Sequence, residues 1–491
     1  MKQRGDGKIT IDPITRLEGH GRIEIFIDDN GNAQKAYLQI PELRGFEKFC
    51  VHRPVEDMPQ LTSRICGVCP TAHHTVATKV LDKIYQIEPT KTARKIRELI
   101  YNAFMFEDHA LHVYILGGPD FIVGSDLPKE LRNVIGVIQK VGLDIVKKLI
   151  LIRKRNRDLI TYLGGKIIHP VFGLPGGVAK GIDRDELPKI KELAKDNLDF
   201  ALFSLNTFKS IVLKNKEYLN LITSPAYTHK TYYMGMVDEK NGLQFYDGKI
   251  RVVDPDGKEY LKFPPEDYLK YISEHIEPWT YIKFCYLKDI GWKGFIDGKD
   301  SGIYCVAPLA RLNVCDFIPT PKAQMAYEDY IKTLSKPVHY TLANHWARII
   351  EMIYASERMI ELANDPDITG NDLRVLPSKE LKERGIDAVE APRGTLFHDY
   401  EVEPSGAVKR VNLIVATQNN SARISMSVDK AAKEFVKNGK IQDGFLNRVE
   451  MAFRAYDPCF GCATHSLPGK MPFIVNIRDN SGKIIKEIIR E

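Results

Sequence analysis

The segment "RICGVCPTAHH", residues 64–74, brings two thiols and two imidazoles together within a short stretch: Cys66, Cys69, His73 and His74. Two cysteines with this spacing occur in zinc ribbons, in thiol–disulfide enzymes and in iron–sulfur proteins. The segment therefore indicates metal or redox chemistry without deciding between them. The decision depends on where the chain supplies further ligands.

A second pair of cysteines with the same spacing, Cys459 and Cys462, lies in "YDPCFGCATH" near the other end of the chain. A zinc ribbon keeps its two pairs close in sequence, because the metal folds a small module that has little core of its own. A dithiol redox centre would leave one pair unexplained. We therefore expect four thiolates that converge on a buried soft metal such as nickel, iron, zinc or copper(I). A redox pair and purely structural cysteines remain alternatives.

The composition is that of a large globular protein. Its 491 residues are 44% hydrophobic and 27% charged, and the formal net charge of +6 is spread along the chain, so no nucleic-acid surface is expected. No stretch is long and apolar enough for a membrane span, and the N-terminus has no signal peptide pattern. The other cysteines are too scattered for a secreted disulfide scaffold. A cytoplasmic protein is expected.

Hydrophobic patterning predicts an α+β protein with a mainly helical core. Residues 21–40 alternate around an Asn-Gly turn, which predicts an N-terminal β-hairpin. Sequence rich in aromatic residues and turns at about 222–310 predicts a β-rich insertion. Helical spacing recurs in six segments: 91–116, 129–163, 185–220, 325–334, 340–362 and 424–437.

We expect these elements to form a single domain over residues 1–491. Its parts are the hairpin and first cysteine pair (1–90), a helical core (91–221), the β-rich insertion (222–310), further helices with the second cysteine pair (311–465) and a C-terminal extension (466–491).

Seven segments resemble the large, catalytic subunit of nickel–iron hydrogenases, and they follow the order of that family along nearly the whole chain. They are "DPITRLEGHGRIE" (12–24), "RGFE" (44–47), "RICGVCPTAHH" (64–74), "DHALHVYILGGPDF" (108–121), "HPVFGLPGG" (169–177), "EAPRG" (390–394) and "DPCFGCATH" (457–465). The resemblance implies the nickel–iron hydrogenase large-subunit fold and the reversible heterolytic cleavage of H2 to protons and electrons. Methanogen-type, methyl-viologen-reducing (F420-non-reducing) members of the cytoplasmic group are most similar.

The resemblance also implies the metals and their ligands. All four cysteines would hold nickel, and Cys69 and Cys462 would also bridge to an iron ion that carries carbon monoxide and cyanide. A magnesium ion is implied nearby. Its ligands match three residues of this chain: Glu47, the backbone carbonyl of Leu413, and His465.

Further residues are implied around the two metals. Glu18 in "RLEGH" matches a glutamate that moves protons, and burial would raise its pKa into a useful range; an ion pair with Arg16 is the alternative. Arg393 matches an arginine over the metals, with a surface ion pair as the alternative. By resemblance, His73 hydrogen-bonds a bridging sulfur and Thr417 a cyanide. The residues expected to orient Arg393 or to lie beside it are Asp108, Asp457 and Pro392.

Partner proteins are implied as well. The remaining cysteines, Cys50, Cys285, Cys305 and Cys315, offer no second cluster, so electrons would leave through an iron–sulfur small subunit. A further electron-transfer subunit with flavin or iron–sulfur carriers, or a heterodisulfide reductase, is expected beyond it. No G-x-G-x-x-G fingerprint follows a strand, so nicotinamide or deazaflavin would bind elsewhere.

The last 26 residues follow His465, the position after which relatives are cut by a maturation endopeptidase. We expect the same cleavage here. The tail could instead be retained, since "FIVNI" and "KIIKEII" flank "RDNSG" in the pattern of a hairpin.

Two other functional classes are alternatives to a hydrogenase. One is a non-catalytic relative, such as the homologous subunit of respiratory complex I, which lacks the four cysteines. The other is a scaffold protein in which zinc joins distant segments.

Overall fold

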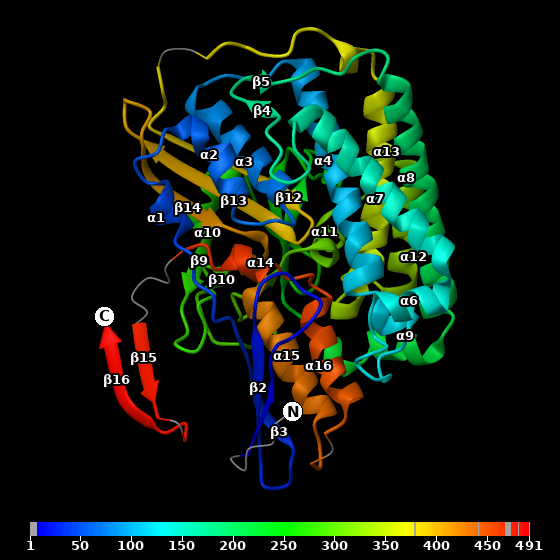
Figure 1. Ribbon diagram of the computed structural model, residues 1–491, viewed down its shortest axis with the longest axis vertical. Coiled ribbons are helices and arrows are strands. Elements are labelled where there is room, and N and C mark those ends of the chain that lie inside the picture. Colours follow the sequence, from blue (N-terminus) through cyan, green and yellow to red (C-terminus); the bar gives the residue numbers. More distant parts are fainter. Residues whose placement is uncertain (1–6, 378–379, 440, 467–472, 480, 491) are drawn as a thin grey trace.

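The computed structural model describes residues 7–377, 380–439, 441–466, 473–479 and 481–490. Long helices pack side by side along one flank of the molecule (Figure 1): α4 (Lys91–Leu111), α7 (Leu143–Gly164), α8 (Leu187–Phe208) and α13 (Asn344–Asn364). Helix α13 lies between α4 and α8 and is buried at every residue from Asn344 to Glu357. Polar side chains on this helix therefore need partners inside the protein.

The expected N-terminal hairpin is present and has one more strand than the sequence pattern indicated. Strands β2 (Arg22–Ile27) and β3 (Ala33–Gln39) form the hairpin, and β1 (Lys8–Ile11) adds to β2 in antiparallel register. Alternate residues of β2, Ile23 and Ile25, are buried against the rest of the protein. The sheet packs beside α15 (Ser421–Phe435), and α16 (Asp443–Arg454) lies next to α15, so the N-terminal sheet meets helices from late in the chain here (Figure 1).

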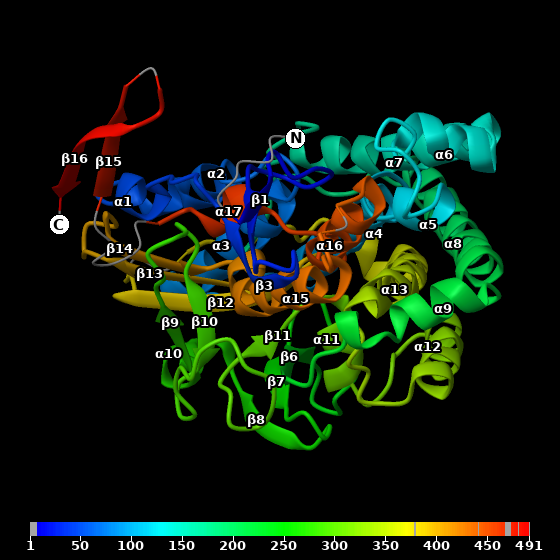
Figure 2. The same ribbon diagram turned by 90° about the horizontal axis from the view of Figure 1, so that it is seen from below.

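The β-rich region lies on the opposite side from the N-terminal helices (Figure 2). Its main sheet has the order β11-β6-β7-β8, with β11 parallel to β6 and the other pairs antiparallel. The strands of this region are β6 (Tyr232–Val237), β7 (Lys249–Val253), β8 (Glu259–Phe263), β9 (Ile272–His275), β10 (Phe284–Leu287) and β11 (Tyr304–Cys305).

A third sheet holds the segment "EAPRG". Strands β12 (Arg384–Ala391), β13 (Gly394–Val402) and β14 (Val408–Ile414) are antiparallel, and a turn at Pro392 and Arg393 joins β12 to β13. Helix α3 (Pro70–Ile84), which begins directly after Cys69, packs on this sheet. The first cysteine pair therefore lies close to the turn that carries Arg393.

Predicted helices are interrupted in the structure, and in the segment 91–116 α4 ends at Leu111 and a π-helical turn (His112–Leu116) follows. The segment 129–163 forms α6 (Val134–Val141) and α7, because Gly142 between them has a φ of 89° that ends the first helix. The segment 185–220 forms α8, a π-helical turn (Lys209–Leu213) and α9 (Lys216–Ile222). The remaining elements are α1 (Phe46–Cys50), α2 (Met58–Ser63), α5 (Pro119–Ile122), α10 (Tyr268–Tyr271), α11 (Pro308–Val314), α12 (Pro321–Leu334), α14 (Ala416–Asn419), α17 (Phe460–Ala463), β4 (Gly173–Leu174) and β5 (Gly177–Val178).

The C-terminal extension contains the hairpin that its sequence predicts. Strands β15 (Phe473–Arg478) and β16 (Ile484–Arg490) pair antiparallel and stand apart from the rest of the molecule in both views (Figures 1 and 2). Within the described part of the chain, no helix combines the length and the apolar character needed to cross a membrane.

Candidate metal centre

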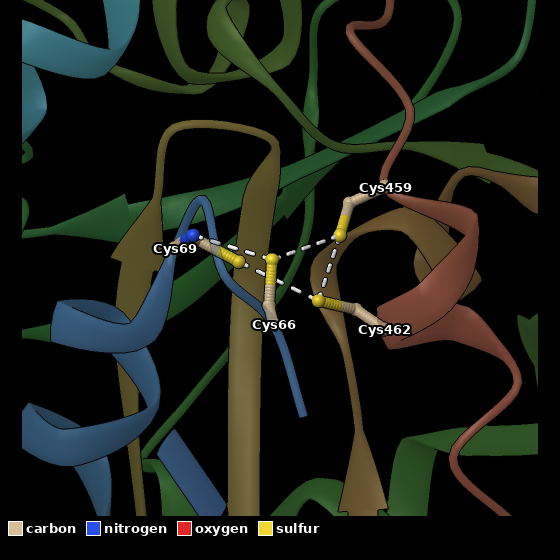
Figure 3. A group of neighbouring side chains, drawn as sticks. All are labelled: Cys66, Cys69, Cys459 and Cys462. Atoms are coloured by element: carbon tan, nitrogen blue, oxygen red, sulfur yellow. Dashed lines mark hydrogen bonds between the residues drawn. The ribbon is translucent and has the colours of Figure 1, made fainter. Parts of the chain in front are cut away.

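The two cysteine pairs meet in the core, as Figure 3 shows. The Sγ atom of Cys66 lies 3.4 Å from Sγ of Cys459, and Sγ of Cys69 lies 3.4 Å from Sγ of Cys462. Within the second pair, Cys459 and Cys462, the sulfur atoms are 2.8 Å apart. All four sulfur atoms lie within 4.8 Å of one another, and all four residues are buried. Of the described residues, this is the one group of His, Cys, Asp and Glu side chains that is arranged to hold a metal ion.

Local structure holds each pair in place. Cys66 lies in the turn between α2 and α3, and its sulfur accepts the backbone N–H groups of Val68 (3.2 Å) and Cys69 (3.3 Å). The second pair is joined to the N-terminal segment, because the N–H of Phe460 donates to the carbonyl of Glu18 at 3.0 Å. The N-terminal segment is thus fixed to the second pair by a backbone hydrogen bond next to the cluster.

The electrostatics of the cluster favour a bound cation. Burial, together with the neighbouring thiols, raises the pKa of Cys459 and of Cys462 well above the usual range. Hydrogen bonds from the other three thiols lower the pKa of Cys66. The protein alone therefore stabilises one thiolate in the cluster, and a metal ion would provide the positive charge needed to ionise the others.

A small cavity lies beside the sulfur atoms of Cys69, Cys459 and Cys462. Much of its wall is apolar, and the polar residues that line it include Arg393 and Thr417. The Nε atom of Arg393 is buried without a hydrogen-bond partner, so it is free to donate to a ligand in this cavity. The apolar side chains of the wall come from Ala72, Ala391, Leu396, Val415 and Ala416.

Arg393 is buried, which excludes the alternative that it forms a surface ion pair. Its Nη1 atom donates to Oδ2 of Asp108 at 3.0 Å, and its Nη2 atom lies 3.0 Å from Oδ2 of Asp457. Burial raises the pKa of Asp108 to about 7. For Asp457, the attraction of Arg393 and His112 outweighs burial and holds the pKa well below its usual range. Of the two carboxyl groups, that of Asp457 therefore keeps its negative charge beside Arg393 to lower pH.

Glu18 lies against the second cysteine pair. Its Oε2 atom accepts hydrogen bonds from Sγ of Cys459 at 2.8 Å and from the N–H of Gly461 at 3.0 Å. Burial, with a further contribution from the charge of Cys66, raises the pKa of Glu18. The alternative partner, Arg16, instead forms an ion pair with Asp120 at 2.5 Å.

The three residues matched to a magnesium site also converge. The Nε2 atom of His465 lies 2.8 Å from the carbonyl oxygen of Leu413 and 3.2 Å from Oε1 of Glu47. The other ring nitrogen, Nδ1, lies 2.7 Å from the carbonyl oxygen of Cys462. This arrangement connects the end of the second cysteine segment to α1 and to β14.

The other expected residues surround the cluster in different ways. His73 lines the cavity, and its Nδ1 atom lies at hydrogen-bond distance, 3.1 Å, from Nε2 of His398. The hydroxyl of Thr417 accepts the N–H of Cys459 at 2.9 Å. The carbonyl of Pro392 accepts a hydrogen bond from Arg311, a residue that no sequence motif indicated. The Nδ1 atom of His112, four residues after Asp108, lies 3.1 Å from Oδ1 of Asp457, a contact that the sequence did not indicate.

A family model for nickel-dependent hydrogenases matches residues 44–131 and 300–465, more than half of the chain, and a model described as HoxL-like matches residues 8–43. The chain belongs to the nickel-dependent hydrogenase family. This hydrogenase chain is similar along nearly its whole length to named relatives. An iron-sulfur subunit of the F420-non-reducing hydrogenase of Archaeoglobus profundus is 46% identical over 98% of this chain and 99% of that protein. The beta subunit of the NAD-reducing hydrogenase HoxS of Cupriavidus necator is 35% identical, with the same coverage.

Solved structures of hydrogenases share the fold of this chain. The NAD+-reducing NiFe hydrogenase in its H2-reduced state has a TM-score of 0.87 and is 34% identical, over 93% of this chain and 99% of that chain. The Ni-Fe-Se hydrogenase of Desulfomicrobium baculatum has a TM-score of 0.73 at 22% identity, over 93% of this chain and 100% of that chain, which shows the fold alone. This hydrogenase chain is therefore an oxidoreductase that acts on H2 at a nickel–iron centre. None of these comparisons supports a zinc scaffold or a non-catalytic relative.

Replacement of Cys66 by serine should abolish nickel retention, because a hydroxyl is a harder and more basic ligand than a thiolate. The matched control is Cys285→Ser, which changes a buried cysteine outside the cluster. We expect nickel per chain, measured by elemental analysis after anaerobic purification, to fall to background in the first variant and to remain normal in the second. Normal nickel content in Cys66→Ser would contradict the assignment.

Proposed function

We propose that the chain is the catalytic subunit of a nickel–iron hydrogenase in which the four cysteines hold nickel, while Cys69 and Cys462 also bridge to iron. The observation that carries the proposal is the cluster of four buried sulfur atoms within 4.8 Å of one another. Thiolates are the ligands that soft transition metals prefer. When bound, the nickel–iron pair supplies the Lewis-acid and redox chemistry that splits H2 and takes up its electrons.

The cavity beside the cluster suits an iron ion that carries carbon monoxide and cyanide. Its apolar wall offers carbon monoxide no competing polar partner, whereas the free Nε–H of Arg393 and the hydroxyl of Thr417 can donate to cyanide. The hydroxyl of Thr417 already accepts from Cys459, so its own hydrogen remains available. We assign these two residues to hydrogen-bond the cyanide ligands.

Glu18 is proposed to receive the proton that H2 cleavage releases. Its carboxylate touches the sulfur of Cys459 at 2.8 Å, so a proton can pass over a single hydrogen bond. Burial raises the pKa of Glu18, and a carboxylate with a raised pKa binds and releases protons closer to neutral pH. Arg393, with Asp108 and Asp457, is proposed to support this chemistry by its charge.

The site of Glu47, Leu413 and His465 is proposed to bind magnesium. Two neighbouring ligands of an octahedral ion at about 2.1 Å are separated by roughly 3 Å. The distances of 2.8 Å and 3.2 Å from Nε2 of His465 to the other two donors fit that geometry. Magnesium there would tie the end of the second cysteine segment to the core.

Electrons are proposed to leave to an iron–sulfur small subunit, then to a further protein with flavin or iron–sulfur carriers, or to a heterodisulfide reductase. The related proteins are named as subunits of larger hydrogenases, which supports partners of this kind. A cytoplasmic location and processing by a maturation endopeptidase belong to the same proposal.

The proposal is tested by anaerobic purification of the complex from its native host. We expect nickel and iron in the large subunit in about equal amounts, infrared bands from bound carbon monoxide and cyanide, and reduction of a viologen dye by H2. Zinc as the metal of the cluster, with none of these bands, would contradict it.

Glu18→Gln should lower H2 oxidation by orders of magnitude while the metal content stays normal, because the amide keeps the shape but cannot carry the proton. The control is Glu24→Gln, on β2, whose carboxylate pairs with Lys8. Both variants are assayed for dye reduction and for nickel. A loss of nickel in Glu18→Gln would assign this residue a structural role instead.

The active enzyme should end at His465. The family model also stops at residue 465, and the tail hairpin stands apart from the cluster. Because the full chain of 491 residues weighs 55.8 kDa, loss of its last 26 residues should lower the mass by about 3 kDa. Intact-mass measurement of the nickel-loaded protein decides this, and a full-length chain with full nickel occupancy would show that the tail is retained.

A further inference from the structure

Arg311 on α11 lies at the centre of a buried ionic cluster that the metal ligands do not include. The side chain is fully buried, and its Nε and Nη2 atoms donate to the two carboxylate oxygens of Glu351 on α13, both at 2.7 Å. Its Nη1 atom donates to Oε2 of Glu390 on β12 at 2.8 Å. One guanidinium therefore joins three elements of the core.

The same guanidinium also holds the backbone directly before Arg393. Nη1 of Arg311 donates to the carbonyl of Ala391 at 2.8 Å, and Nη2 donates to the carbonyl of Pro392 at 3.1 Å. These two carbonyls belong to consecutive residues at the turn between β12 and β13. Because both carbonyl groups are held, the backbone of the turn has little freedom to rotate at Arg393.

Other contacts hold the turn from its remaining sides. Oε1 of Glu390 accepts the hydroxyl of Thr395 at 2.7 Å, and the side chain of Asn420 donates to the carbonyl of Arg393 at 3.1 Å. Gly394 has a φ of 129°, and a Cβ atom there would lie 2.2 Å from Cγ2 of Val306. The turn is thus pressed against the start of α11, which carries Arg311.

A buried ionic cluster of this kind contributes little to the free energy of unfolding. Removing an arginine and two carboxylates from water is costly, and apolar side chains of similar volume often stabilise a core as well or better. What the cluster provides is a defined position for the turn, since a planar guanidinium makes several hydrogen bonds in a fixed geometry.

We propose that Arg311 is a positioning residue that sets the backbone of the turn, so that the free Nε–H of Arg393 faces the cavity at the metal centre. Arg311 acts through Arg393 and does not itself line that cavity. This inference rests on the proposed function, because its consequence concerns the ligands that Arg393 would contact.

The test is Arg311→Lys in the purified complex. A lysine keeps the charge, but one ammonium cannot serve two carboxylates and two carbonyl groups in the geometry that the guanidinium uses. We expect nickel to be retained, H2 oxidation to fall by about 10- to 100-fold, and the cyanide infrared bands to shift. A purely structural role would lower the unfolding temperature and leave the band positions unchanged.

Arg97→Lys is the matched control. Arg97 is also buried, donates to Asp82 at 2.5 Å and 3.3 Å, and donates to the carbonyls of Leu174 and Gly177. It contacts neither the turn nor the cavity. We expect this variant to be less stable, with normal bands and activity.

A double-mutant cycle with Arg393→Lys shows whether Arg311 acts through Arg393. Arg311→Lys should then have little further effect on the bands, because the two changes remove the same interaction. If Arg311→Lys fails to fold, Thr395→Val, which removes the donor to Glu390, should give a smaller band shift in the same direction.

Unshifted bands with normal activity in a folded variant would overturn the positioning role and leave the proposed function intact. Absence of the bands in the wild-type protein would instead overturn the proposed function.

Discussion

Four thiols buried within 4.8 Å of one another cannot all ionise unless a cation compensates their charge, and the centre of the structure is built around this constraint. The protein lowers the pKa of Cys66 but raises the pKa of Cys459 and Cys462. The protein alone therefore favours the thiolate of Cys66, and a metal ion is needed to ionise the other two. A backbone hydrogen bond between Glu18 and Phe460 also ties the second pair to the N-terminal segment.

The polar groups around the cluster form successive layers. Arg393 faces the cavity and is balanced by Asp108 and Asp457, while Arg311 holds the backbone that carries it. Such buried charges add little net stability, so their presence between otherwise apolar helices and strands indicates a requirement for geometry. The buried helix α13 supplies Glu351 to this arrangement, which connects the helical bundle to the site.

The sequence was most informative where chemistry is carried by rare residue types in short motifs. The cysteine pairs could be named from residue type and spacing, whereas Glu18 and the group of Glu47, Leu413 and His465 were named through the family resemblance; the structure brings each set together. Arg311 could not be found in this way, because its partners lie on α13 and β12, far away in the sequence, and no local pattern marks them. The breaks in the predicted helices at 129–163 and 185–220 were missed for a different reason: apolar periodicity continues across a single Gly142 or a π-helical turn.

One site formed by four cysteines is proposed to hold both nickel and iron. Anomalous diffraction at the nickel and iron absorption edges, from anaerobically grown crystals of the complex, tests it most directly. We expect two separate peaks, with nickel within bonding distance of all four sulfur atoms and iron beside Cys69 and Cys462. A single zinc ion among the four sulfurs, or nickel bound elsewhere in the chain, would contradict it.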